Sequence, residues 1–260
     1  AASVADRVLL GGMLIMLYGC ARNSDVARAT ATRIDLCDID EEELGDNEPC
    51  GYIELAVVGS KGARSVKLRR AILPVVAPML TVSGRPWWKS WMESRRSVGI
   101  ASDGELDKPI LCRFSPLGEP EGMSLQATET GAMLRCVLGI RDENINTIRS
   151  HSLKVTCLSW LAKYGIPLEY RRSLGHHLDV SAQSAECYSR DAMAPALRKL
   201  CEVVKSIEKE VFFPDSTRSG RFKRLDTQSA PLFPPQPAPF LMPLEDKLQE
   251  TDGHDESEVS

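Results

Sequence analysis

Spacings of three and four residues between apolar positions predict that much of the chain is helical. The longest apolar stretch, residues 4–19, predicts a buried helix that ends at Gly19 and Cys20. A capping turn follows it and predicts another helix from about Asp25. Further helices are predicted from Pro86, over 124–138, from Ser150 to Gly165, over 168–174 and over 189–213.

One part of the chain carries the pattern of strands. Residues 51–59 predict a strand, and residues 64–77 predict its antiparallel hairpin partner, which Pro78 closes. Residues 36–49 and 99–122 are rich in turn formers or charges and predict irregular connections. These elements together predict a mainly helical α+β fold with a small antiparallel sheet.

Composition divides the chain into a domain and a tail. The 260 residues are 43% hydrophobic, so the chain can bury a core. Residues 1–213 carry equal numbers of acidic and basic side chains, and the net charge of −4 comes from the tail, 214–260. The tail is rich in proline and then acidic, which predicts disorder. Residues 51–113 hold 11 basic side chains against 5 acidic ones and predict a local basic surface.

Two compositional features bear on the cellular compartment. The eight cysteines stand singly, without a Cys-x-x-Cys pair, which favours reduced thiols in a cytosolic or nuclear protein. The longest continuous apolar run, residues 8–18, is too short to span a bilayer. We therefore expect no membrane partner.

Reactive side chains gather in residues 150–191, which hold three of the four histidines. His151 and Lys154 are three residues apart on a predicted helix, so we expect their side chains to meet on one turn. The other members of this group are His176, His177 and Tyr188.

Two more candidates lie far upstream. Arg22 stands in a turn with Asp25. Lys61 lies on the turn of the predicted hairpin, and Lys67 is the alternative to it. A lysine on such a turn is a flexible point charge that can act as a proton donor.

In this order, the residues resemble the catalytic core of the tyrosine recombinases, the phage-integrase family, over roughly residues 5–205. That family has an arginine turn, a hairpin lysine, His-x-x-Arg, Leu-Gly-His and a nucleophilic tyrosine. The context of Tyr188, Cys-Tyr-Ser-Arg-Asp, is most similar to eukaryotic mobile-element members of the DIRS-like and Crypton-like kinds. Two features depart from the family. Lys154 replaces the second arginine, and the segment between His176 and Tyr188 is longer than usual.

The resemblance implies an integrase-like catalytic domain that cleaves and rejoins DNA in integration or site-specific recombination. Double-stranded DNA is then the partner, with self-association on DNA, and neither a small-molecule substrate, a cofactor nor a metal is required. Arg22, Lys154 and one of His176 and His177 would hold the phosphate, and the Asp25 carboxylate would orient the Arg22 guanidinium. His151 would relay the tyrosine proton, Tyr188 would attack, and Lys61 would protonate the leaving oxygen. We expect the family's N-terminal helical DNA-clamping domain to be absent or truncated in this chain, which implies weak DNA binding by this chain alone.

Other functions fit the same residues. One is a type IB topoisomerase-like activity, which uses the same chemistry. Another is a catalytically impaired DNA-binding or scaffold protein derived from a mobile-element recombinase, which the lysine at 154 favours. A helical interaction protein with a partner-recruiting tail is a third. The expected location is nuclear, or cytoplasmic if the protein is prokaryotic.

Overall fold

Helix α1, Val4–Tyr18, packs against α2, α4, α6 and β3 and forms much of the core. We describe the protein from a computed structural model, in which residues 2–36, 51–58, 72–140, 147–176 and 190–223 are described. The Ser3 hydroxyl accepts the Asp6 N–H at the start of α1, and the Asp6 carboxylate accepts the Ser3 N–H in return. The predicted buried helix that ends at Gly19 is confirmed.

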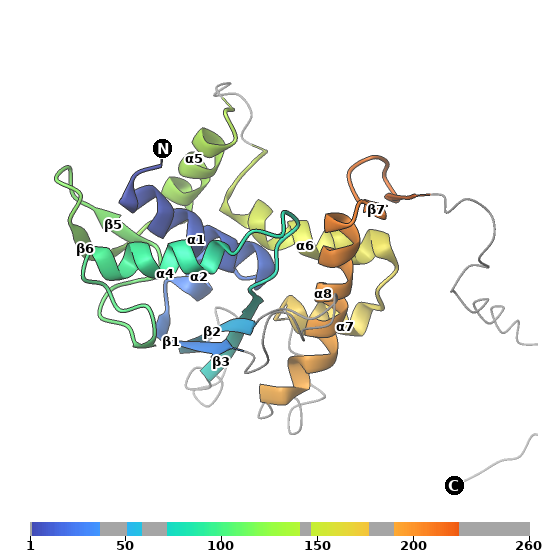
Figure 1. Ribbon diagram of the computed structural model, residues 1–260, viewed down its shortest axis with the longest axis horizontal. Coiled ribbons are helices and arrows are strands. Elements are labelled where there is room, and N and C mark those ends of the chain that lie inside the picture. The colour runs from blue at the N-terminus through green and yellow to red at the C-terminus, as the bar shows by residue number, and fades with distance from the viewer. Residues whose placement is uncertain (1, 37–50, 59–71, 141–146, 177–189, 224–260) are drawn as a thin grey trace, which may run out of the picture. The chain divides into compact units, whose positions relative to one another are not determined.

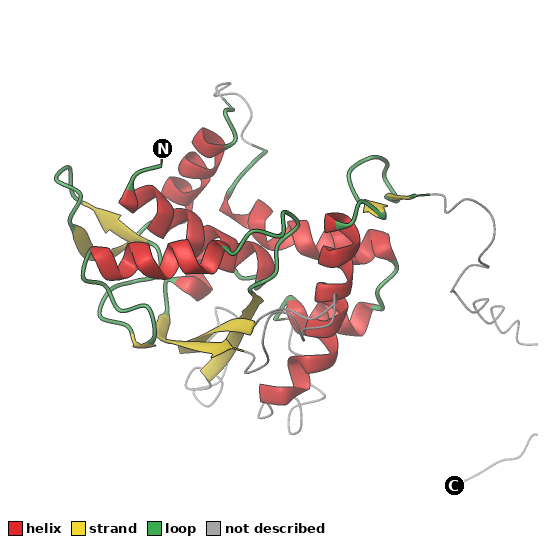
Figure 2. Cartoon of the chain, viewed as in Figure 1, coloured by secondary structure: helices red, strands yellow, loops and turns green. Residues whose placement is uncertain are grey.

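Among the described residues, the largest sheet has four antiparallel strands in the order β3-β2-β1-β4 (Figures 1 and 2). These strands are β1 (Ala29–Leu36), β2 (Gly51–Val58), β3 (Ile72–Pro78) and β4 (Gly104–Glu105). Alternate side chains of β2 are completely buried, namely Ile53, Leu55 and Val57. The predicted pairing of β2 with an antiparallel partner that ends at Pro78 is confirmed, while the turn between them lies outside the described residues.

Strand β1 corrects a prediction. The turn after α1 was expected to begin a helix near Asp25, but α2 (Asn23–Val26) is a single turn, and the chain enters β1 three residues later. Threonine and isoleucine alternate with smaller or charged residues in β1, a pattern that suits a strand better than a helix. Hydrogen-bonded pairing with β2 along most of the length of β1 stabilises the extended conformation.

The region between β3 and α5 is more regular than predicted. Helix α4 (Trp87–Ser97) is confirmed, and it packs against α1. Residues 99–122 were expected to be irregular, but they contain β4, β5 (Cys112–Phe114) and most of β6 (Pro120–Ser124). Strands β5 and β6 form a short antiparallel hairpin whose turn includes Gly118 at φ 81°.

The second half of the chain is mainly helical. Its elements are α5 (Ala127–Val137), α6 (Ser150–Tyr164), α7 (Leu168–Leu174), a 3-10 helix (Arg190–Met193), α8 (Ala194–Glu208), β7 (Phe212–Phe213) and β8 (Arg221–Phe222). Gly165 ends α6 in the left-handed conformation, as predicted. Helix α8 was expected to continue to residue 213 but ends at Glu208, and Glu210 then takes a positive φ of 54°.

Helix α6 is packed between α1 on one side and α8 on the other (Figure 1). The fold is therefore mixed helix and strand with a small antiparallel sheet, which agrees with the predicted α+β class. In the parts of the chain that the structure describes, no helix has the length and apolar character needed to cross a bilayer. The compact unit extends to Lys223, and the Pro-rich and acidic tail beyond it lies outside the described residues.

Candidate functional site

The turn between α1 and α2 holds Arg22. The Ala21 N–H donates to the Met16 carbonyl at 3.0 Å, and the Arg22 N–H donates to Asp25 Oδ2 at 3.0 Å, so both ends of the turn are fixed. The Arg22 side chain is partly buried. Its guanidinium has no hydrogen-bond or ion-pair partner among the described residues. Its donors are therefore available to a ligand.

Lys154 lies on α6 with only 1% of its surface exposed. Its Nζ donates to the Gly175 carbonyl oxygen at 2.6 Å, and Gly175 ends α7. Burial and, to a smaller degree, the charge of Arg22 lower the pKa of Lys154 to about 8. The ammonium group is therefore mostly protonated at pH 7 but titrates close to neutrality.

His176 follows α7 directly, in the left-handed conformation with φ 54°. Its Nε2 lies 3.1 Å from the Gly19 carbonyl oxygen at the end of α1. A carbonyl oxygen only accepts hydrogen bonds, so Nε2 must carry the hydrogen and Nδ1 must be the free acceptor in neutral imidazole. Burial, opposed by the bond to Gly19 and helped by the Lys154 charge, lowers the pKa of His176 to about 4. The ring is therefore neutral at pH 7.

Arg22, Lys154 and His176 come from three segments that are distant in sequence and close in space. The Arg22 charge affects the proton affinity of both Lys154 and His176, and the Lys154 charge affects that of His176. Two hydrogen bonds hold the arrangement, one from Lys154 to Gly175 and one between His176 and Gly19. They join the end of α7 to α6 and to the end of α1.

Asp25 and Arg28 complete the charges of this cluster. Asp25 Oδ1 forms an ion pair with Arg28 Nη2 at 3.1 Å, and the Asp25 side chain is 2% exposed. The expectation that Asp25 orients the Arg22 guanidinium is wrong, because its second oxygen accepts the Arg22 backbone N–H instead. Among the described residues, this cluster therefore contains three cationic side chains, Arg22, Arg28 and Lys154, and one carboxylate. An excess of buried or partly buried positive charge of this kind favours an anionic ligand.

Cys157, beside this cluster, is not an activated nucleophile. Cys20 and Cys157 are completely buried. A hydrogen bond with the Cys20 thiol, together with burial, raises the pKa of Cys157 well above its ordinary value. A neutral, buried thiol is a packing group. We therefore assign no chemistry to this pair.

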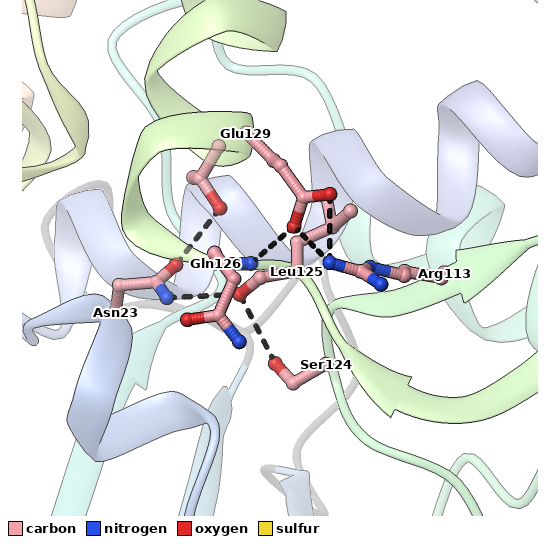
Figure 3. A network of polar contacts seen from close by, with 7 residues as sticks. Asn23, Arg113, Ser124, Leu125, Gln126 and Glu129 are labelled. Atoms are coloured by element: carbon pink, nitrogen blue, oxygen red, sulfur yellow. Dashed lines mark hydrogen bonds and ion pairs between the residues drawn. The ribbon is translucent and has the colours of Figure 1, made fainter.

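A polar network fixes the Arg22 turn against α5 (Figure 3). The Asn23 side chain donates to the Leu125 carbonyl at 3.0 Å and accepts the Thr130 hydroxyl at 2.8 Å. Glu129 accepts the Gln126 N–H at 2.6 Å and pairs with Arg113 at 2.8 Å. The network anchors the residue next to Arg22 to the first turns of α5.

The structure gathers some of the predicted site residues and not others. Arg22, Lys154 and His176 meet as described. His151 is exposed on the first turn of α6, and the expected meeting with Lys154 is not formed, since Lys154 turns inward toward Gly175. Lys61, the alternative Lys67, His177 and Tyr188 lie outside the described residues.

Sequence reasoning missed three residues that support the cluster. Arg28 stands three residues after Asp25, and this spacing across a helical turn is a signal for an ion pair. Asn23 and Thr130 are 107 positions apart, so no local pattern connects them.

Within the described ranges, no group of three or more His, Cys, Asp or Glu side chains is placed to hold a metal ion. Comparison of the sequence with protein-family models gives no match, and comparison with curated proteins gives none either. The chemistry of the cluster must therefore be argued from its own residues.

Proposed function

We propose that this protein cleaves and rejoins DNA strands through a covalent bond between Tyr188 and a 3′-phosphate, in DNA integration or site-specific recombination. The observation that carries the proposal is the convergence of Arg22, Lys154 and His176. These side chains come from the three segments that resemble the family's arginine turn, His-x-x-Arg helix and Leu-Gly-His motif, and their proximity supports the proposal.

A cation cluster suits a phosphodiester because its two non-bridging oxygens share a negative charge that repels a nucleophile. Arg22 can donate two parallel hydrogen bonds to such a group. Lys154 supplies a second positive charge, and its ammonium has three hydrogens, of which one is bound to Gly175. Both cations stabilise the further charge that develops on the phosphoryl oxygens in the transition state.

In the proposed reaction, the Tyr188 hydroxyl oxygen attacks phosphorus and forms a phosphotyrosine bond to the 3′ side of the strand. The bond from phosphorus to the 5′-oxygen breaks. His151 accepts the tyrosine proton, and Lys61 gives a proton to the departing 5′-oxygen. Attack by a 5′-hydroxyl reverses the step, so rejoining requires no external energy source.

The hydrogen bonding of His176 indicates which of His176 and His177 is the better candidate to contact the phosphate. Its Nε2 hydrogen is engaged by Gly19, and its Nδ1 has no hydrogen when the ring is neutral. A neutral His176 in this position cannot donate a hydrogen bond to a phosphoryl oxygen. We therefore assign phosphate contact to His177 and give His176 the task of fixing the end of α7.

The test is covalent capture on nicked duplex DNA. A pool of duplexes with randomised sequence removes the need to know the target site. A nick close to the cleavage point lets the short 5′-hydroxyl fragment diffuse away, which traps the intermediate. We expect a protein–DNA species that survives denaturation in SDS with the wild type and with Tyr170→Phe, a matched control on α7, but not with Tyr188→Phe.

Other outcomes separate the alternative functions. DNA binding without an adduct would indicate an impaired DNA-binding derivative, which the replacement of the family arginine by Lys154 favours. Relaxation of supercoiled plasmid without strand exchange would indicate a topoisomerase-like activity. Absence of both an adduct and DNA binding would overturn the proposal.

A further inference from the structure

Arg28 lies between α2 and β1 and belongs to no motif that the sequence presents. Its guanidinium Nη2 forms the 3.1 Å ion pair with Asp25 Oδ1, and 35% of its side chain is exposed. Its Nε is buried and has no hydrogen-bond partner among the described residues. Arg28 is therefore held by one strong contact, to a carboxylate that is almost completely buried.

Both oxygens of Asp25 are occupied, and neither is bound to a cation of the proposed phosphate site. Oδ1 binds Arg28, and Oδ2 accepts the Arg22 backbone N–H. The Asp25 charge nevertheless acts on both Lys154 and His176, so this carboxylate lies within electrostatic reach of the cluster. The ion pair with Arg28 holds the charged Oδ1 of Asp25 and leaves the Arg22 and Lys154 side chains without a bond to this carboxylate.

We infer that Arg28 is a positioning residue, which pairs with Asp25 and so keeps Arg22 and Lys154 free to hold an anionic phosphate. This inference rests on the proposed function, because it assigns Arg28 to the same site. Arg28 acts through Asp25 and does not itself have to touch the DNA.

The physical reason is competition for a buried carboxylate. A carboxylate without a partner in the interior is strongly destabilised, so it binds the nearest cation that can reach it. If Arg28 is removed, the candidates are the Arg22 guanidinium and the Lys154 ammonium. A phosphate would then meet a carboxylate that competes for the same donors, and its binding would weaken.

Among the described residues, the charged and titratable groups that act on Lys154 or that its charge acts on are Arg22, Asp25, Cys20 and His176. Arg22 and burial disfavour its protonated form, whereas Asp25 favours it. A stronger contact with Asp25 therefore has a measurable signature, which is a higher pKa of Lys154.

The experiment compares Arg28→Gln, Arg28→Lys and the double variant Arg28→Gln/Asp25→Asn in the full chain. The matched control is Arg33→Gln, which removes an exposed arginine from β1. Asparagine at 25 keeps an oxygen for the Arg22 N–H but has no charge. The first readout is the rate of covalent adduct formation at saturating nicked DNA. The second is the pKa of Lys154 in the free protein, from an NMR titration of ¹³C-labelled lysine assigned with Lys154→Met.

We expect Arg28→Gln to slow adduct formation by about 10-fold or more and to raise the pKa of Lys154 by about half a unit or more. Arg28→Lys should restore much of the rate. The double variant should also recover, because the charge that Arg28 controls is gone. If Arg28 had only a structural role, the additional change Asp25→Asn would not restore the rate of adduct formation.

Two results would overturn the inference. One is an Arg28→Gln variant whose adduct rate and Lys154 titration both match those of Arg33→Gln. The other is a double variant that is no faster than Arg28→Gln alone. Failure of the proposed function can be distinguished from failure of this inference. If the wild type forms no adduct, the proposed function fails, but the Lys154 titration still tests whether Arg28 keeps the Asp25 charge away from Lys154.

Discussion

Arg95 on α4 and Lys154 on α6 are both cationic and almost completely buried, yet their surroundings differ. The Arg95 guanidinium donates to four backbone carbonyls and lies over the Trp91 ring at 5.4 Å. The carbonyls are those of Ala101, Lys108, Pro109 and Ile110. Among the described residues, Lys154 has one acceptor, the Gly175 carbonyl, and the charge of Arg22 opposes its own.

The comparison separates a cation with a structural role from one whose surroundings suit the proposed role in binding an anion. Arg95 is nearly saturated by fixed backbone oxygens that connect α4 to the segment before β5, so it has little capacity for a ligand. Lys154 has unused hydrogens and a cationic neighbour, an arrangement that costs stability until an anion arrives. A site selected for stability alone would resemble the first environment.

The largest expected effect is on stability, at Arg95. Replacement by methionine removes the donor from one buried carbonyl and three partly buried carbonyls, so Arg95→Met should lower the free energy of unfolding by about 3–5 kcal/mol. Urea denaturation measures this. Arg96→Met is the control, since Arg96 is exposed and should change stability by less than about 1 kcal/mol. A loss below about 1 kcal/mol for Arg95→Met would contradict the structural assignment.

Lys154 should behave in the opposite way. In Lys154→Met, relief of the buried charge offsets the loss of the hydrogen bond to Gly175, so stability at pH 7 should change by less than about 1.5 kcal/mol. Adduct formation should fall by about 100-fold. Urea denaturation and covalent capture on the same sample check the two parts. A destabilisation as large as that of Arg95→Met would remove the distinction between the two cations.

The buried charge of Lys154 also predicts how the free energy of unfolding depends on pH. Its pKa in the folded protein, about 8, is below its ordinary value of 10.5. Between these values the unfolded chain holds the proton and the folded protein does not, so this residue makes stability rise with pH across that window. The free energy of unfolding of the wild type should therefore rise relative to that of Lys154→Met between about pH 8 and pH 10, which urea denaturation across this range measures. An equal pH dependence of the free energy of unfolding in the two proteins would argue against a buried charge at Lys154.

A smaller effect is expected at His176. Its folded pKa of about 4 lies below the ordinary 6.5, so stability attributable to this residue should fall as pH decreases from about 6.5 toward 4. His176→Gln should remove about 1–2 kcal/mol of this decline, because its amide cannot take up a proton in this range. The glutamine amide nitrogen corresponds to the imidazole Nε2, so the variant keeps a donor for the Gly19 carbonyl. Unfolding curves at pH 7 and pH 4.5 measure the difference. An equal decline in both proteins would show that His176 is not the neutral group that fixes α7.

Local signals were sufficient for the helices that surround the site. Gly19 and Gly165 end α1 and α6 at the predicted residues, and Pro167 precedes α7. Strand β1 was missed because a capping turn at Asp25 has the same local pattern whether a helix or a strand follows. Only pairing with β2 decides between them.

Sequence order was sufficient to name Arg22, Lys154 and His176 as candidates, but it did not predict their environments. Lys154 and His151 share a helical turn, yet only Lys154 turns inward, since its ammonium reaches a carbonyl 21 residues away. The Asp25–Arg28 pair likewise changes the role expected for Asp25. Such contacts depend on distances in space between segments, which apolar spacing does not specify.

The most direct test of the central claim is identification of the residue that carries DNA after covalent capture. The trapped complex is digested with nuclease and trypsin, and the peptides are examined by mass spectrometry. We predict a nucleotide 3′-phosphate on the tryptic peptide 173–190, which contains Tyr188 as its only tyrosine. A nucleotide on any other residue, or an unmodified peptide 173–190 in a sample that forms the adduct, would contradict the account.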